Sequence, residues 1–172
     1  MATSLQMAAG DPLLLERVRA CRRLLNRRAV VGAAASAVPV PGLDWAVDAA
    51  LLSRLLPEIN AQFGLTPEQL DRLPRHQREQ AQKAISVVGS LVVGKVVTRD
   101  LVIRLARAVG VRMSGKQAAR YVPVAGQAVA ALMGYAAIRY LGEEHIKDCV
   151  RVVREAGLAL PPAPLSMVER LS

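Results

Sequence analysis

The sequence predicts one all-α domain, a helical bundle of about six or seven helices that includes two helical hairpins broken by proline and glycine. Two observations predict this class. Apolar side chains recur at intervals of three and four residues, which is the spacing of an amphipathic helix, and proline or glycine ends each of these stretches. The 172 residues, 52% of them hydrophobic and 22% charged, suffice for one folded domain and exclude a disordered chain.

Three segments follow one another along the chain. We expect a disordered N-terminal tail over 1–10, a helical domain over 11–157 and a proline-rich C-terminal tail over 158–172. The last segment contains Pro161, Pro162 and Pro164. Because proline lacks the backbone N–H that a helix needs, we expect this tail to be extended and mobile.

The first helix of the domain begins at Asp11, which suits an N-cap, and Pro12, which suits the first turn. An apolar stripe follows at helical spacing, formed by Leu14, Val18, Cys21 and Leu25. Arg19, Arg23 and Arg27 fall on the opposite face. We expect the helix to stop at a break formed by Pro39, Pro41 and Gly42.

The middle of the chain predicts further helices. One begins at Asp44 and ends at Gly64, and Thr66 with Gln69 forms a capping box that starts a short helix. Another helix starts after Pro74 and continues to Val109. Within it, small residues at a spacing of four predict a close-packing face, namely Ser86, Ser90 and Gly94.

The longest uncharged run extends over 121–138, between Arg120 and Arg139. Pro123 and Gly126 form its predicted helix break, and Ala130 and Gly134 extend a second small-residue face. Eighteen helical residues would rise about 27 Å, against a hydrocarbon core of about 30 Å. The run therefore fits either a hairpin that dips into one leaflet or a buried helix of a soluble bundle. After Gly142, a separate amphipathic helix is expected to continue to Gly157.

Positive charge is concentrated in two blocks. Residues 1–43 carry +4 and residues 74–120 carry +8, whereas residues 44–73 carry −3 and residues 121–172 are balanced, which gives the net charge of +9. Each block precedes an apolar stretch, which suits contact with anionic headgroups, although solvated helix faces explain it equally well. The residues predicted to contact a membrane are Arg19, Arg22, Arg23, Arg27, Arg28, Arg112, Lys116, Arg120, Tyr121, Arg139 and Tyr140.

Catalytic and ligand-binding motifs are weak. Gly89–Val96 resembles a phosphate-binding loop but ends in Val96, which lacks the required hydroxyl. His145 and Cys149 lie one helical turn apart, and zinc needs more ligands than this pair supplies. The basic blocks before Arg120 contain no aromatic residue for stacking on bases, which disfavours nucleic acid. We therefore predict no catalytic residue, no metal and no cofactor.

Four segments of the chain together resemble the bacterial domain of unknown function 697. They are 38–44, 116–127, 139–142 and 145–149, and the similarity covers most of 20–155. The resemblance implies an all-helical hydrophobic module that is often fused behind a small GTPase domain and often lies in membranes. No catalytic residue is established for that family, so none is implied here, and this sequence shows no GTPase motif.

Two functions remain open from the sequence. The first is a non-enzymatic, membrane-associated module on the cytoplasmic side of the bacterial inner membrane, which acts with a GTPase. The second is a soluble cytoplasmic bundle that serves protein–protein interaction or forms a homo-oligomer. Basic blocks that adjoin uncharged runs, one of them bracketed by Tyr121 and Tyr140, favour the first function. Arg99, Arg104 and Arg107 would give their helix one solvated face and favour the second.

Overall fold

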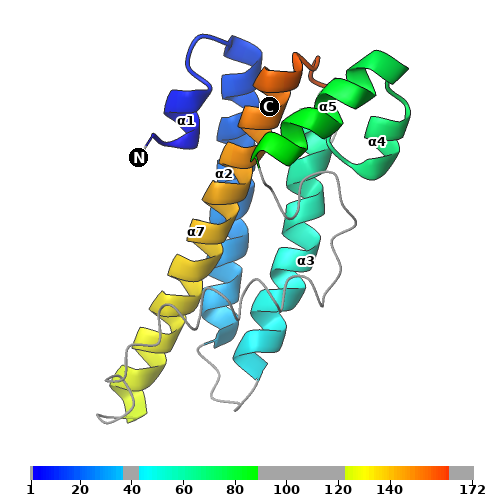
Figure 1. Ribbon diagram of the computed structural model, residues 1–172. Helices are drawn as coiled ribbons and strands as arrows, with labels where there is room; N and C mark the ends of the chain where they lie inside the picture. The colour runs from blue at the N-terminus through cyan, green and yellow to red at the C-terminus, as the bar shows by residue number, and fades with distance from the viewer. Residues whose placement is uncertain (1, 37–42, 89–122, 163–172) are drawn as a thin grey trace. The chain divides into compact units, whose positions relative to one another are not determined.

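The computed structural model describes residues 2–36, 43–88 and 123–162, and these residues fold only into helices and connecting turns (Figure 1). The predicted all-α class is therefore confirmed. The helices are α1 (Ser4–Met7), α2 (Pro12–Ser36), α3 (Leu43–Phe63), α4 (Pro67–Asp71), α5 (Arg75–Val88) and α7 (Pro123–Ala156).

The chain divides into two compact units. Unit 1 comprises Met1–Leu24, Leu56–Val96 and Glu143–Ser172, and unit 2 comprises Leu25–Leu55 and Val97–Gly142. The three long helices α2, α3 and α7 contribute residues to both units. Unit 1 also contains the short helices α1 and α4 together with α5.

The predicted helix boundaries follow from local hydrogen bonds. The Asp11 carboxylate accepts a hydrogen bond from the Leu14 amide at 3.0 Å, so Asp11 caps α2 as expected. Thr66 and Gln69 form the predicted capping box at the start of α4. Gly64 ends α3 in a left-handed conformation with φ of 74°, a conformation that side-chain-bearing residues rarely adopt.

The core of unit 1 lies where α2, the second half of α3 and the second half of α7 bury their apolar faces. On α2 the predicted stripe residues Leu14, Val18 and Cys21 are buried. The largest buried side chains from the other elements are Phe63, Ile59, Leu65, Ile146 and Val150. Each such side chain contributes about 1.5–3 kcal/mol through burial, so this apolar core is the main stabilising feature of the unit.

Within 2–10, for which the sequence predicts a disordered tail, the structure describes a short helix. Ser4–Met7 is helical, and Thr3 and Gln6 form a reciprocal capping box around its first turn. Ser4 is buried and bonds to Glu143 on α7, and Ala8 is buried as well. A single helical turn is marginal by itself, so this long-range contact explains why the segment is ordered.

The first residues of the predicted C-terminal tail, 158–162, belong to no helix and contact the rest of unit 1 at Pro161. The Arg17 guanidinium donates a hydrogen bond to the carbonyl oxygen of Pro161. A Cβ atom at Gly64 would lie 3.2 Å from Cδ of Pro161, which shows how closely the two segments pack. The mobility predicted for the tail stays a prediction, and residues 163–172 lie outside the described part of the chain.

The predicted interruption at Gly142 is wrong, since α7 continues through it to Ala156. A Cβ atom at Gly142 would lie 2.3 Å from Cδ1 of Leu25 in unit 2. The glycine therefore serves close approach of α2 and α7 and does not end a helix. Pro123 is the first residue of α7, and Gly126 lies inside the first turn without interrupting the helix.

Ser86, the first residue of the small-residue face predicted on α5, does not pack against any other described helix. Ser86 is exposed, and its hydroxyl donates a hydrogen bond to the Gln82 carbonyl of its own helix at 2.9 Å. Ala130 and Gly134 lie in α7, but the packing of these two residues is outside what the structure describes. Several other predicted residues also lie outside the described part: Pro39, Pro41, Gly42, Ser90, Gly94, Arg112, Lys116, Arg120 and Tyr121.

Candidate functional site

The arginines of α2 separate into an exposed set and a half-buried set. Arg19, Arg23 and Arg27 are exposed, as their helical spacing predicts. No ion pair joins any of these three to a residue that the structure describes. Arg22 and Arg28 are half-buried, and Arg22 pairs with Glu143 at 3.3 Å. Of the five predicted headgroup contacts on this helix, three are therefore directly available to a partner.

Exposed apolar side chains occur beside the arginines of unit 2. On α2, Val30 and Val31 each retain 58% of their surface, directly after Arg27. On α7, Leu132 retains 67% and Tyr140 retains 58%, and the Arg139 side chain preceding Tyr140 is half-buried. Exposed large apolar side chains that gather beside charge are typical of surfaces that meet a partner or a lipid bilayer.

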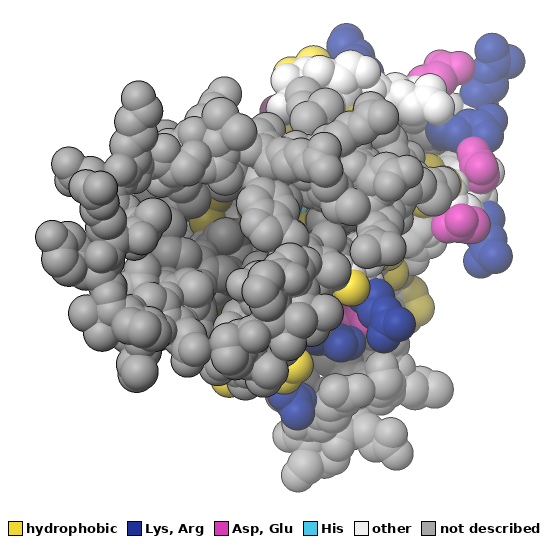
Figure 2. Space-filling model, turned by 90° about the horizontal axis from the view of Figure 1, so that it is seen from below, with side chains coloured by type: hydrophobic (Ala, Val, Ile, Leu, Met, Phe, Trp, Pro, Cys, Tyr) yellow, Lys and Arg dark blue, Asp and Glu magenta, His cyan; other side chains and the backbone are white. Residues whose placement is uncertain are grey.

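Arg75 and Arg78 of α5 are paired with acidic side chains, unlike Arg19, Arg23 and Arg27 of α2. Arg75 bonds to Glu79 at 3.0 Å, and Arg78 lies 3.6 Å from Asp71. Figure 2 shows Lys and Arg side chains next to Asp and Glu side chains along the edge of the molecule where Figure 1 places α4 and α5. A paired surface of mixed sign attracts an anionic partner less than the arginines of α2 do.

Within 2–36, 43–88 and 123–162, no helix combines the length and the apolar character that crossing a bilayer requires.

A polar cluster lies inside the core of unit 1, where α3 and α7 meet. The His145 Nε2 atom is 2.9 Å from the Asn60 Oδ1 atom, and the Cys149 thiol lies 3.6 Å from the same oxygen. The thiol is also 3.8 Å from His145 Nε2. All three side chains are buried. The sequence pattern identified the pair on α7 but missed Asn60. The sign that could have revealed it is a polar residue placed among the apolar residues of α3, between Ile59 and Phe63.

Burial keeps the groups of this cluster neutral. It lowers the pKa of His145 to about 4, an effect that a hydrogen bond to the Leu56 backbone opposes only in part. Burial also raises the pKa of Cys149 well above its ordinary value, and the neighbouring Cys21 raises it further. Burial raises the pKa of Cys21 to about 12, despite the positive charge of Arg17.

A Cys–His–Asn set occurs in some nucleophilic enzymes, but this cluster does not have the electrostatics of such a site. A nucleophilic cysteine needs a stabilised thiolate and access for substrate. Here burial disfavours the thiolate of Cys149, and the side chain is fully enclosed. Among the residues that the structure describes, no three potential ligands are arranged to hold a metal ion. The cluster therefore joins α3 to α7 as part of the packed core.

A second polar contact joins α1 to α7. The backbone N–H and the hydroxyl of Ser4 both donate to Oε1 of Glu143, at 3.0 and 2.7 Å. Burial raises the pKa of Glu143, but the bonds from Ser4 and the charges of Arg22 and Lys147 outweigh it and hold this pKa below its ordinary value. Arg154 adds a hydrogen bond to the Met7 carbonyl at 2.6 Å. Glu143 is thus an ionised anchor for α1.

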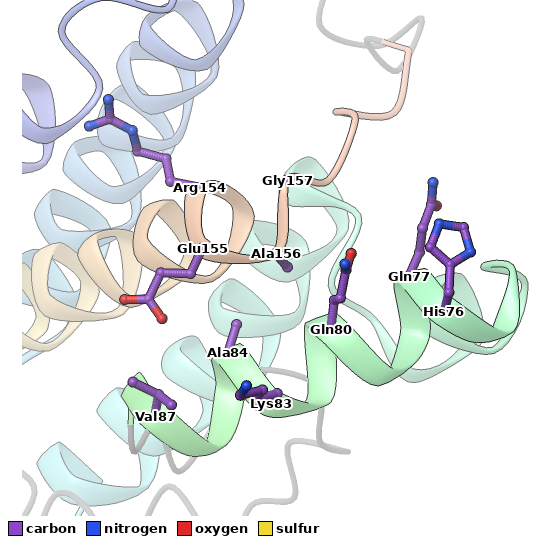
Figure 3. A pocket seen from close by; sticks show the side chains of 10 residues that line it. All are labelled: His76, Gln77, Gln80, Lys83, Ala84, Val87, Arg154, Glu155, Ala156 and Gly157. Atoms are coloured by element: carbon purple, nitrogen blue, oxygen red, sulfur yellow. The ribbon is translucent and has the colours of Figure 1, made fainter.

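An open groove of about 640 Å³ separates α5 from the C-terminal end of α7. Figure 3 shows Gln80, Lys83 and Ala84 of α5 along one side and the turn at Gly157 on the other. The Arg154 side chain points away from α5, in agreement with its bond to Met7. The lining side chains offer amides, the Lys83 ammonium, the His76 imidazole and the Glu155 carboxylate. None of them is a serine, threonine or cysteine that could act as a nucleophile.

Comparison with known proteins adds no relative. No protein-family model matches the chain, and neither a curated protein nor a solved structure matches it. The resemblance to the domain of unknown function 697 remains a prediction that rests on the segments named above.

Proposed function

We propose that this chain is a non-enzymatic helical module that binds anionic membrane surfaces through the exposed face of α2, on the cytoplasmic side of the bacterial inner membrane. One observation carries the proposal: Arg19, Arg23 and Arg27 are exposed at successive turns of one helix and have no acidic partner among the described residues. Their charges are therefore available to lipid phosphates.

The expected strength of this contact is modest. Each arginine near an anionic surface contributes about 1 kcal/mol, which gives about 3 kcal/mol for the three residues. The exposed side chains of Val30 and Val31 add apolar contact at the headgroup boundary. Because the main contribution is electrostatic, we expect reversible binding that weakens as salt is added.

The non-enzymatic part of the proposal is supported by the buried cluster. Cys149 and His145 are the described groups whose chemistry most resembles a nucleophile and its base, and burial keeps both of them neutral and enclosed. Their arrangement stabilises the packing of α7 on α3 and offers no surface to a substrate.

The test is cosedimentation with vesicles of phosphatidylglycerol and phosphatidylcholine, compared with vesicles of phosphatidylcholine alone. The triple variant Arg19→Gln, Arg23→Gln, Arg27→Gln should lose about a hundredfold in affinity, which corresponds to about 3 kcal/mol. The matched control removes the same charge elsewhere, through Arg72→Gln, Arg75→Gln and Arg151→Gln, and should change affinity by about twofold or less. Equal binding to both kinds of vesicle, or equal loss in both variants, would contradict the proposal.

A second function is favoured by a separate observation. Leu132 and Tyr140 of α7 are large apolar side chains that remain exposed in unit 2. A protein-interaction or homo-oligomerisation module would bury them, and the family resemblance suggests a small GTPase as the partner. In light scattering coupled to size-exclusion chromatography, a stable oligomer of the parent that Leu132→Ser and Tyr140→Ser dissociate would favour this function.

A further inference from the structure

Glu143 and His145 lie two positions apart on α7 and join this helix to different neighbours in unit 1. The Glu143 carboxylate accepts two hydrogen bonds from Ser4 on α1 and pairs with Arg22 on α2. The His145 imidazole bonds to Asn60 on α3. Two titratable side chains thus hold α7 against three other helices.

His145 fits its surroundings as a neutral imidazole. From α3 it meets the Asn60 amide and the Leu56 backbone, and from α7 it meets the Cys149 thiol. On the α2 side, the group that acts on Cys149 is Cys21, a second neutral thiol. These neighbours are dipoles and thiols, which do not balance a full positive charge in a buried site.

The charged groups around the cluster do not change this conclusion. The charge that α2 brings to Cys21 is the cation of Arg17, which cannot balance a proton on His145. On α7, the Asp148 carboxylate acts on Cys149, but it is paired with Arg151 at 3.2 Å. On α7, the Lys147 ammonium bonds to Glu144 at 2.6 Å, so this carboxylate is already paired. Burial of an imidazolium here would therefore be costly.

Glu143 has the opposite requirement, since it fits its site only as an anion. Both Ser4 donors point to Oε1, and Arg22 Nε lies 3.3 Å from Oε2. Hydrogen bonds to an ionised acceptor are roughly twice as strong as neutral ones. Protonation of Glu143 would therefore weaken the attachment of α1.

We propose that unit 1 contains an acid-operated latch, in which proton uptake by His145 and Glu143 releases α7 from α3 and from α1. The inference goes beyond membrane binding and needs no lipid. Protonation of either residue weakens the packing of the same helix, so the two effects add. Release would uncover the apolar face of α7 at Ile146, Val150 and Val153, which are buried in the closed form.

The direction of both pKa shifts agrees with opening at low pH. The pKa of His145 falls from 6.5 to about 4 because of burial. The pKa of Glu143 is also lowered, since Ser4 and the cations outweigh its burial. The open form therefore binds protons first, and stability that is present above pH 6.5 is lost as the pH falls toward 4. For His145 alone, the opening equilibrium constant rises by up to about 300-fold across this window.

Hydrogen–deuterium exchange of the full chain tests the latch directly. Peptides covering α1 and 143–156 are compared at about pH 7 and about pH 4.5, after correction for the intrinsic exchange rate. We expect these peptides to lose protection at the lower pH by about a hundredfold. Binding of an apolar fluorescent dye, measured over the same pH range, should rise in parallel.

Variants that cannot take up a proton identify the groups involved. The double variant His145→Gln, Glu143→Gln should show little acid-induced opening. Its matched control is His76→Gln, Glu79→Gln, which changes an exposed histidine and an exposed glutamate on α5 and should open as the parent does.

Either of two results would overturn the proposal. One is acid-induced opening of the double variant that is as steep as that of the parent. The other is independent of any substitution: the imidazole NMR resonances of the parent assign a pKa to each histidine. A pKa for His145 near that of His76 would show that the imidazole is not held neutral.

Discussion

Two adjoining segments of α7 are held by different kinds of contact. In unit 2, the segment that ends at Gly142 approaches α2 so closely that Leu25 occupies the place of a side chain. In unit 1, the segment that begins at Glu143 is held by hydrogen bonds and charges, through Ser4, Arg22 and Asn60. The first kind of contact depends on volume and is insensitive to pH. The second kind of contact depends on the protonation state of Glu143 and His145.

The largest effect is expected at Gly142, where the volume-dependent contact is tightest. Gly142→Val should destabilise the protein by about 3 kcal/mol, because its Cβ would lie 2.3 Å from a Leu25 side chain that is itself buried. Chemical denaturation measures the loss. When Leu25→Ala is added to Gly142→Val, the loss of stability should be smaller than the sum of the losses in the two single variants. The control is Ala136→Val, at an exposed position of α7.

A smaller effect is expected when the buried polar cluster of unit 1 is broken. Asn60→Ala leaves His145 and Cys149 without the oxygen that they share, so we expect a loss of about 1–3 kcal/mol in the free energy of unfolding. Asn26→Ala, at an exposed position of α2, should change this free energy by less than about 0.5 kcal/mol. An equal effect at both positions would show that the cluster does not hold α7 to α3.

The contact between α1 and α7 predicts a still smaller effect. Ser4→Ala removes the hydroxyl that donates to Glu143 at 2.7 Å but keeps the backbone donor, so we expect a loss of about 1–1.5 kcal/mol. Thermal unfolding and hydrogen–deuterium exchange of the α1 amides both measure this loss of stability. The control is Ser53→Ala, whose hydroxyl bonds only to the Ala50 carbonyl of its own helix. Unchanged protection of α1 in Ser4→Ala would contradict the assigned role.

The fold could be predicted wherever the decisive contact is local. The Asp11 cap and the Thr66 capping box are set within three or four residues, and both occur as expected. The order of α1 and the continuity of α7 could not be predicted, because each depends on a contact between distant segments. Glycine inside a helical pattern is usually a sign of an end, and only the position of Leu25 shows why Gly142 is tolerated inside α7.

The candidate site was predicted to a similar degree. Helical periodicity correctly placed Arg19, Arg23 and Arg27 on the exposed face of α2. It could not separate Arg22 from them, because its partner Glu143 lies far away in the sequence. Asn60 was missed for the same reason, since its role depends on the histidine of another helix.

The last test needs no substitution and leaves stability at neutral pH unchanged: it is a chemical probe of the two thiols of unit 1, which are buried like apolar core residues. Cys21 and Cys149 are buried, and burial raises the pKa of Cys21 from 9.0 to about 12. A disulfide reagent should therefore label the native protein only as fast as unit 1 opens. In denaturant, both thiols of the protein should react at once. Because the unfolded thiol ionises first, stability present below pH 9.0 is lost as the pH rises toward 12. Rapid labelling at neutral pH would show that the core around α7 is open in the native state, and both the cluster and the latch would then need another explanation.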